Sequence, residues 1–127
     1  MKMINPKKFS KSLIHAFNGF LYLIKTQNNF RIHILISLAV VITGIFLKIN
    51  NFEWLILLLV IGLVWVVEAI NTVFERLFDL VDESFNPIVK VGKDVSAAAV
   101  LFSAILSVIV GVLIFIRPFL TWLKSIL

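Results

Sequence analysis

The chain has 127 residues, of which 61% are hydrophobic and only 15% are charged. Soluble domains average roughly 45–50% apolar and about 25% charged residues, and so short a chain cannot bury this excess in its own core. The composition therefore excludes an ordinary soluble enzyme, a disordered chain and a nucleic-acid-binding module. The absence of cysteine excludes a disulfide framework, a zinc ribbon and a thiolate nucleophile.

Residues 1–29 are predicted to form an amphipathic helix on a membrane surface. Apolar residues recur at helical spacing from Phe9 to Ile24, and every charged residue of the segment is basic. A signal peptide is the alternative interpretation. Polar residues interrupt the apolar stretch, however, and no A-x-A-like cleavage site follows it.

Three further stretches are apolar enough to cross a membrane as helices. The first is uncharged from Ile32 to Leu47 and would be about 24 Å long, slightly short for a hydrocarbon core of about 30 Å. The second begins at Trp54, an aromatic residue suited to the membrane interface. The prediction is an all-α integral membrane protein with one domain, made of a surface helix (1–29) and three spans (30–49, 53–80 and 93–117).

The remaining segments are expected to be irregular. The polar residues 81–92 predict a loop. Arg117-Pro118 is expected to close the third span and leave a C-terminal tail, residues 118–127. Lysine and arginine concentrate in the N-terminal segment and between residues 75 and 94, and such residues favour the cytoplasmic side. We therefore expect a multi-pass protein of the bacterial cytoplasmic membrane, with its N-terminus inside and its C-terminus outside.

Small residues recur at every fourth position of the third span. Such a face allows close helix packing in lipid. Packing within one chain and packing between subunits explain it equally well, and three short spans favour oligomerisation. The residues are Ala99, Ser103, Ser107 and Gly111.

A polar stripe runs along the end of the second span. At 100° per residue its side chains fall within an arc roughly 100° wide, and ionised groups inside a membrane are costly and usually functional. Two or more carboxylates on one face, without cysteine or histidine, favour Mg²⁺ over zinc. The stripe consists of Glu68, Asn71, Thr72, Glu75 and Asp79.

Lys93 and Asp94 follow the predicted loop, at the expected start of the third helix. A lysine ammonium and the free N–H groups of a helix N-terminus both attract phosphate. Together with the polar stripe they fit phosphoryl transfer to a lipid hydroxyl, with Glu68, the deepest acid, as the base. Structural alternatives stay open: interhelical hydrogen bonding for Glu68, solvation for the outer acids, snorkelling for Lys93 and capping for Asp94.

The sequence from Glu68 to Asp79 resembles the signature of the prokaryotic diacylglycerol kinase family, E-x-x-N-[ST]-x-x-E-x-x-x-D. Lys93-Asp94 with the small residues 96–99 resembles a second block, and Asn-Phe-Arg-Ile-His at 29–33 resembles a third. The resemblance implies a homotrimer of lipid kinase subunits with active sites between subunits. It also implies Mg²⁺ as cofactor, ATP as phosphate donor and a membrane lipid alcohol as acceptor. Undecaprenol is favoured over diacylglycerol because of the third block and the loop containing Pro87.

The resemblance also implies roles for individual residues. Glu68 would be the catalytic base and Glu75 a Mg²⁺ ligand, with Asn71 and Asp79 as supporting polar residues. The implied nucleotide contacts are Glu75, Lys8, His15, Ser84, Asn86, Lys93 and Asp94. The implied contacts with the lipid are Glu68, Asn29, Arg31, Phe46 and Ala97.

One departure from the family concerns the metal. The family commonly has a glutamate where this chain has Gln27. Glutamine keeps an oxygen ligand but removes a negative charge, which should weaken Mg²⁺ binding. A tolerated variant, a different metal arrangement and a weak or inactive kinase are the open interpretations. A small proton-coupled transporter that uses Glu68 is the alternative from a different functional class.

Overall fold

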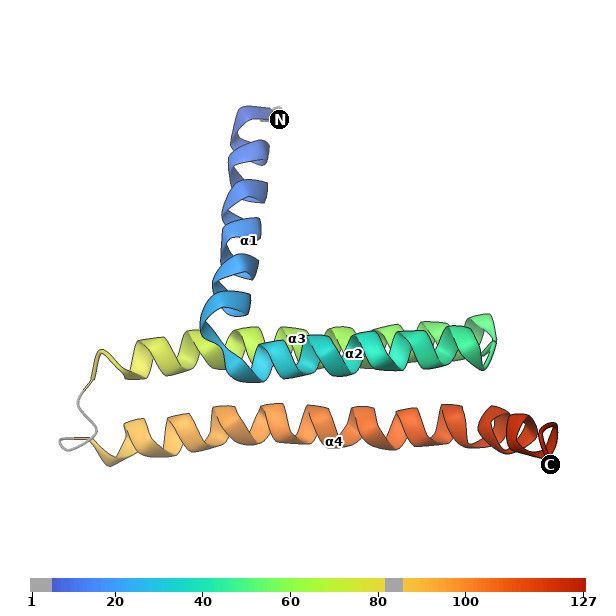
Figure 1. The fold of residues 1–127 in the computed structure, drawn as a ribbon. Coiled ribbons are helices and arrows are strands. Elements are labelled where there is room, and N and C mark those ends of the chain that lie inside the picture. The colour runs from blue at the N-terminus through green and yellow to red at the C-terminus, as the bar shows by residue number, and fades with distance from the viewer. Residues whose placement is uncertain (1–5, 82–85) are drawn as a thin grey trace.

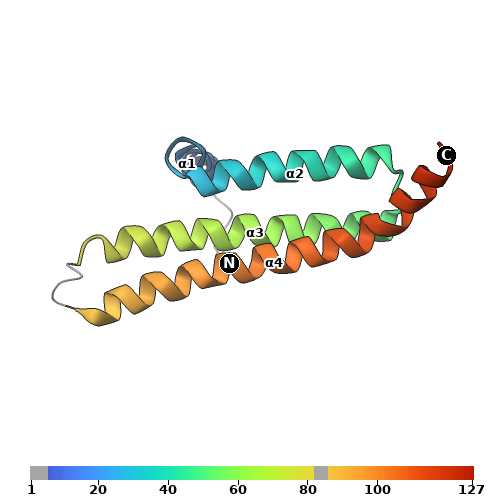
Figure 2. The ribbon, with the colours of Figure 1, turned by 60° about the horizontal axis from the view of Figure 1, so that its bottom comes forward.

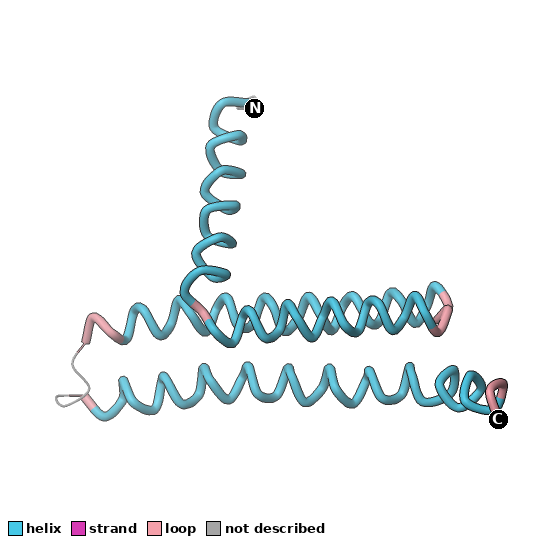
Figure 3. Tube along the Cα trace, viewed as in Figure 1, coloured by secondary structure: helices cyan, strands magenta, loops and turns pink. Residues whose placement is uncertain are grey.

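The computed structural model describes residues 6–81 and 86–127, and within these ranges every regular element is an α-helix. Three helices lie lengthwise beside one another, and the N-terminal helix projects sideways from them (Figure 1). Loops are confined to the connections and the C-terminus (Figure 3). The all-α prediction is confirmed. The helices are α1 (Pro6–Thr26), α2 (Asn28–Phe46), α3 (Asn51–Phe78) and α4 (Pro87–Lys124).

The helices α2, α3 and α4 are each long and apolar enough to cross a membrane. Large hydrophobic side chains point outward from all three. For example, Leu35, Leu59 and Leu113 keep 65%, 65% and 70% of their surface exposed. In water such a surface would be strongly unfavourable. The chain is therefore a multi-pass membrane protein, with α3 packed against both α2 and α4.

The junction between α1 and α2 is held by an arginine and an aromatic cluster. The Arg31 guanidinium donates hydrogen bonds to the carbonyls of Ile24 and Lys25, both at 2.6 Å, and so caps the end of α1. The rings of Phe20, Phe30 and Trp65 lie 5.7–6.3 Å apart between centroids. These contacts fix where α1 leaves the bundle.

The connection between α2 and α3, residues 47–50, forms what we call the turn end of the bundle. Lys48 adopts a positive φ of 52° there, and Asn50 and Glu53 form a reciprocal capping box. This cap starts α3 at Asn51, two residues before the predicted start at residue 53. The opposite end of the bundle, where α3 leads into α4, is the loop end.

The start of α4 differs from the prediction of a loop over residues 81–92. The helix begins at Pro87, because proline is well suited to the first helical turn, where its missing N–H leaves no bond unmade. The side-chain oxygen of Asn86 accepts a hydrogen bond from the Ile88 N–H at 3.0 Å and caps the helix.

The helix also extends beyond the predicted end of the third span at Arg117-Pro118. The helix continues through Pro118 to Lys124, so residues 118–124 are helical rather than a tail. The last turns bend across the turn end (Figure 2), as a proline inside a helix allows. The Trp122 ring then packs against Phe46 at 5.6 Å between centroids, a contact that stabilises the helix beyond the proline.

Candidate active site

Glu68 is an acidic side chain buried in the apolar part of α3. Only 1% of its surface is exposed. In the part of the chain that the structure describes, its Oε2 atom accepts no hydrogen bond. A buried carboxylate oxygen without a partner is energetically costly, and a catalytic role or a bound group is one explanation for such an atom.

Asn71 and Glu75 lie one and two turns further along the same face. The Asn71 side-chain N–H donates to a Glu75 carboxylate oxygen at 3.0 Å and orients that carboxylate. The other polar atom of Asn71, Oδ1, is buried and has no partner among the described residues. Two buried oxygens, on Glu68 and Asn71, are thus available to a donor or a cation.

These side chains share a cleft of about 310 Å³ between α2, α3 and α4. The cleft brings together five residues predicted from the sequence, which are Asn29, Glu68, Asn71, Glu75 and Ala97. Since three helices contribute to it, Glu68, Asn71 and Glu75 of the polar stripe form one wall of an open cleft. Its remaining lining residues are Ile32, His33, Val100, Leu101 and Ala104.

Lys93 and Asp79 form an ion pair at the loop end, with 3.1 Å between Nζ and Oδ1. Their side chains are 29% and 52% exposed, so the pair contributes about 1 kcal/mol or less. The lysine can therefore turn toward a phosphate at little cost. Lys93 and Asp94 lie in the second turn of α4, so the prediction that they stand at the start of this helix is wrong. Asp94 is therefore not its cap, and the free N–H groups of the helix start lie before these residues.

The other predicted nucleotide contacts do not gather at this cleft. Lys8 and His15 lie on exposed turns of α1, which projects away from the bundle (Figure 1). Asn86 caps α4. Ser84 lies outside the described residues.

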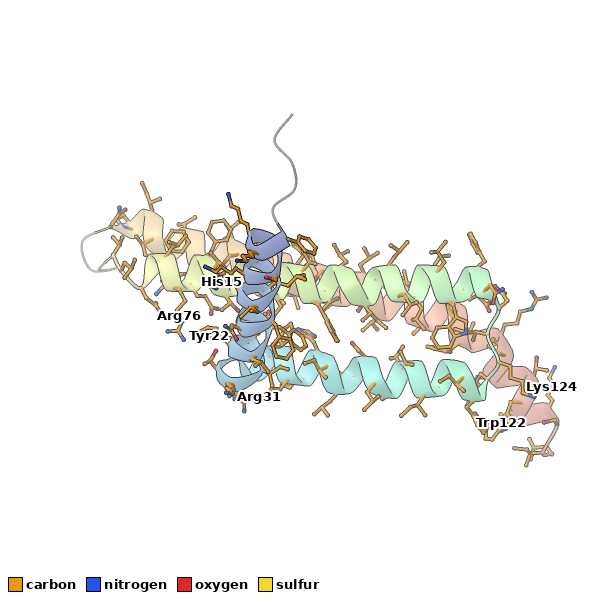
Figure 4. The ribbon with its side chains drawn as sticks, turned by 90° about the horizontal axis from the view of Figure 1, so that it is seen from above. His15, Tyr22, Arg31, Arg76, Trp122 and Lys124 are labelled. Carbon is orange, nitrogen blue, oxygen red and sulfur yellow. The ribbon has the colours of Figure 1, made fainter. Side chains whose placement is uncertain are left out.

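Two of the predicted lipid contacts lie outside the cleft, and so does Gln27, the position where the family has a second metal ligand. Arg31 caps α1. Phe46 packs against Trp122 at the turn end, at the far end of the bundle from Arg76 and Tyr22 (Figure 4). Gln27 is the N-cap residue of α2 without a capping side-chain hydrogen bond, and the cleft lining includes Asn29 from this region but not Gln27.

His33 is a cleft residue to which the sequence interpretation gave no role. It lies four residues after Asn29 on α2, and this spacing places both side chains on one helix face. The i, i+4 spacing from Asn29 was the signal in the sequence that could have assigned His33 to the site. Without that spacing, a single histidine in an apolar segment does not indicate a function.

The family comparison agrees with this geometry. The family model described as "Prokaryotic diacylglycerol kinase" matches residues 14–115. The chain belongs to this family of lipid kinases. This membership favours a kinase over the transporter alternative.

Several curated relatives are similar to this kinase. An undecaprenol kinase of Bacillus subtilis is 37% identical over 86% of this chain and 89% of the relative. A diacylglycerol kinase of Synechocystis is 37% identical over 87% of this chain, but the match spans only 63% of the relative. A diacylglycerol kinase of Helicobacter pylori is 29% identical over 78% of this chain and 77% of the relative. No solved structure matches the chain.

The cleft of this kinase has oxygen donors that fit Mg²⁺. Among the described residues, no three His, Cys, Asp or Glu side chains gather into a metal site. Mg²⁺ does not need such a cage, because it is usually held by one or two carboxylates together with substrate phosphates. The Glu75 carboxylate and the unpaired Asn71 Oδ1 provide oxygens of this kind.

Proposed function

We propose that this protein transfers the γ-phosphoryl group of ATP to the hydroxyl of a membrane lipid alcohol, with Mg²⁺ as cofactor. The observation that carries the proposal is the burial of Glu68, with its unpaired Oε2, in the cleft that also holds Asn71 and Glu75. A neutral alcohol can reach this carboxylate from the lipid phase. A phosphate donor can reach Glu75 and Lys93 from the aqueous side.

In the proposed reaction, Glu68 accepts the proton of the lipid hydroxyl as the hydroxyl oxygen attacks the γ-phosphorus. A new oxygen–phosphorus bond forms, the bond from the γ-phosphorus to the bridging oxygen breaks, and ADP leaves. Asn71 holds the Glu75 carboxylate in place, and Lys93 contributes positive charge near the transferred group. Bound Mg²⁺ would neutralise part of the phosphate charge.

The proposed placement in the membrane puts the loop end and α1 at the cytoplasmic face and the C-terminus outside. The apolar face of α1 supports its position on the membrane surface, because Phe9 and Phe17 each remain 61% exposed in the single chain. An amphipathic helix with basic residues lies favourably at an anionic lipid surface. All charged residues of the N-terminal segment are basic, so the segment meets this requirement.

A homotrimer with active sites between subunits is part of the proposal. The predicted nucleotide contacts on α1 lie away from the cleft of their own chain, which is the pattern expected if a neighbouring subunit completes the site. The large apolar side chains that stay exposed in the single chain, among them Leu59 and Leu113, form the surface that such an assembly would bury.

Undecaprenol is the favoured acceptor and diacylglycerol the next. The match to an undecaprenol kinase spans 89% of that relative, whereas the first diacylglycerol kinase match spans 63%. The block at residues 29–33 contributes Asn29 and His33 to the cleft.

Transfer of radiolabelled phosphate from ATP in mixed micelles tests this function directly. Undecaprenol and diacylglycerol are compared with and without Mg²⁺, using purified protein whose helicity and oligomeric state have been measured. Magnesium-dependent labelling of undecaprenol, with less labelling of diacylglycerol, is the expected result. Folded, oligomeric protein that labels neither lipid would contradict the proposal and indicate an inactive family member.

A further inference from the structure

A second polar cleft lies at the turn end of the bundle. It has a volume of about 690 Å³ and is formed by the α2–α3 connection and the last turns of α4. It is remote from the active-site cleft, because Glu68 is roughly 26 Å along α3 from Asn51, where this helix begins. We call it the turn-end cleft. Its lining includes Lys48, Asn50, Glu53, Arg117 and Trp122.

The two basic residues of the turn-end cleft lie at the depth where lipid headgroups begin. The chain is uncharged over residues 32–47 and again over residues 95–116, and Lys48 and Arg117 directly follow these two stretches. An apolar span ends at the boundary between hydrocarbon and headgroups. Trp122, an aromatic residue suited to this boundary, lies at the same end of the bundle (Figure 4). Both cations are therefore at the level of the phospholipid phosphates.

Neither of these basic side chains has a partner within the described residues. Lys48 and Arg117 form no ion pair and no side-chain hydrogen bond there. The one carboxylate that lines the cleft, Glu53, already accepts a backbone N–H at 2.8 Å within the capping box. The Thr121 and Ser125 hydroxyls donate to carbonyls of α4 at 3.1 and 2.6 Å. Two cationic donors thus remain available in one cleft, a combination that suits an anion.

Lys48 occupies a backbone position that favours glycine or asparagine. Its φ of 52° is in the left-handed region, and the N–H of Ile49 donates to the Gly44 carbonyl at 3.2 Å as α2 ends. Glycine and asparagine are preferred at such a position because most other side chains strain the backbone there. Residues held in this conformation cluster at functional sites, which agrees with a role for the Lys48 side chain.

The apolar part of the turn-end cleft favours a lipid phosphate over free phosphate. The Phe46 and Trp122 rings, 5.6 Å apart between centroids, line the cleft beside the two cations. They come together because α4 bends across the turn end (Figure 2). A free phosphate gains nothing from aromatic surface, whereas a phospholipid can place its phosphate at the cations and its first methylene groups at the rings.

We propose that the turn-end cleft binds the phosphate group of a phospholipid from the adjacent leaflet. Lys48 and Arg117 hold the phosphate oxygens, and the Phe46 and Trp122 rings contact the first part of the acyl chains. The bound lipid thereby joins the α2–α3 connection to the end of α4. It is distinct from the acceptor of the proposed reaction, which is an alcohol that reacts at Glu68, and the site does not depend on the proposed function.

Binding of dioleoylphosphatidylglycerol to purified protein in a neutral detergent tests the site, with the Kd of the first bound lipid measured by native mass spectrometry. Arg117→Gln and Lys48→Asn each remove one cation, and asparagine tolerates the positive φ of Lys48. Lys124→Gln is the matched control, because it removes the same charge at the same end of the bundle (Figure 4) and Lys124 does not line the cleft. The comparison ligands are a galactolipid with the same acyl chains but no phosphate, and inorganic phosphate.

Arg117→Gln and Lys48→Asn are each expected to raise the Kd about fivefold, and together about 30-fold, as is usual for basic residues that contact anionic lipid. Lys124→Gln should raise it less than about twofold, because solvent and salt screen a charge outside the cleft. The galactolipid and inorganic phosphate should bind wild-type protein more weakly than the phospholipid.

Three outcomes of this experiment would overturn the proposal. Equal effects of the three substitutions would mean that the basic residues attract lipid without forming a site. Galactolipid binding as tight as that of the phospholipid would mean that the phosphate is not recognised. Inorganic phosphate that binds as tightly as the phospholipid would assign the cleft to a free anion.

Thermal unfolding separates a ligand site from a purely structural role of Lys48. Phosphatidylglycerol should raise the unfolding temperature of wild-type protein and of Lys124→Gln, but not that of the Lys48→Asn/Arg117→Gln double variant. Without lipid, Lys48→Asn should unfold at the wild-type temperature or above it, because asparagine suits the turn. A lower unfolding temperature of Lys48→Asn with unchanged lipid binding would make Lys48 only a cap of α2 and overturn the proposal.

Discussion

The functional meaning of an acidic residue in this chain depends on its burial and its partners. Glu68 is 1% exposed and its Oε2 is unpaired within the described residues, whereas Glu53 lies at the turn end and completes the capping box of α3. The Glu68 carboxylate thus raises the free energy of the folded state, and the Glu53 carboxylate lowers it. The two residues give opposite expectations when they are replaced.

Glu68→Gln is expected to reduce the transfer rate at least about 100-fold, the contribution of a general base. It should leave the thermal stability unchanged or raised, because it removes a carboxylate that is costly to bury. Phosphate transfer and thermal unfolding followed by circular dichroism measure the two effects. Glu53→Ala is the control, with lower stability by about 1 kcal/mol and normal activity. Lower stability of Glu68→Gln together with retained activity would assign Glu68 a structural role.

Asn71→Ala is expected to raise the Mg²⁺ concentration needed for half-maximal activity by about tenfold, as is usual when a residue that orients a metal ligand is lost. The physical reason is the loss of the 3.0 Å hydrogen bond that orients Glu75. Magnesium titrations at saturating ATP measure this shift. Thr72→Ser, which keeps the hydroxyl bonded to the Glu68 carbonyl, should behave as wild type. An unchanged magnesium requirement in Asn71→Ala would show that neither the Asn71 oxygen nor its hydrogen bond to Glu75 contributes to the metal site.

At the scale of the helices, the contact between α3 and α4 near the loop end depends on a glycine. A Cβ at Gly92 would collide with the ring of Phe78, and Phe78 stacks on Phe74 at 6.1 Å between centroids. The backbone of α4 can approach α3 here only because Gly92 has no side chain. This approach brings Lys93 within reach of Asp79.

Gly92→Ala is therefore expected to separate α3 from α4 at the loop end and to lower both stability, by about 1–3 kcal/mol, and transfer activity. Thermal unfolding and the transfer assay measure the two losses. Gly62→Ala, where a Cβ meets nothing within 4 Å, should change neither. Phe78→Leu in the Gly92→Ala background should restore part of both. Full activity of Gly92→Ala would show that the close approach is not needed for the site.

The strongest sequence patterns correctly predicted the helices and the polar stripe. Long apolar segments and the shared helix face of the residues from Glu68 to Asp79 are local properties of the sequence. The structure contains the corresponding helices. The end of α4 could not be predicted in this way, because Pro118 is compensated by the distant contact between Phe46 and Trp122. The active-site cleft also depends on three helices, so the sequence did not assign His33 a role in it.

At the scale of the whole molecule, the single chain has an apolar surface between two ends that both carry charged residues. The loop end has the Lys93–Asp79 ion pair, and the turn end has Lys48, Arg117 and Glu53 around a polar cleft. This separation supports an arrangement in which each end faces one side of the membrane.

The orientation can be measured with single-cysteine variants, because the natural chain has no cysteine. Ser125→Cys, in the exposed C-terminal turn, is expected to react in intact cells with a maleimide that does not cross membranes. Ser10→Cys on α1 is expected to react only after the cells are opened. The reverse pattern would place α1 and the loop end outside, where ATP is scarce, and would contradict the proposed function.

The deep position of Glu68 has a consequence for the fate of the reaction product. A lipid alcohol reaches the carboxylate without charge, but under the proposed function it leaves with a phosphate that water solvates strongly. The same apolar surroundings that admit the alcohol then repel the new anion toward the aqueous boundary. Departure of the phosphorylated lipid is thus favoured by hydration, and its return to the pocket is opposed by dehydration, so the membrane itself gives the catalytic cycle a direction.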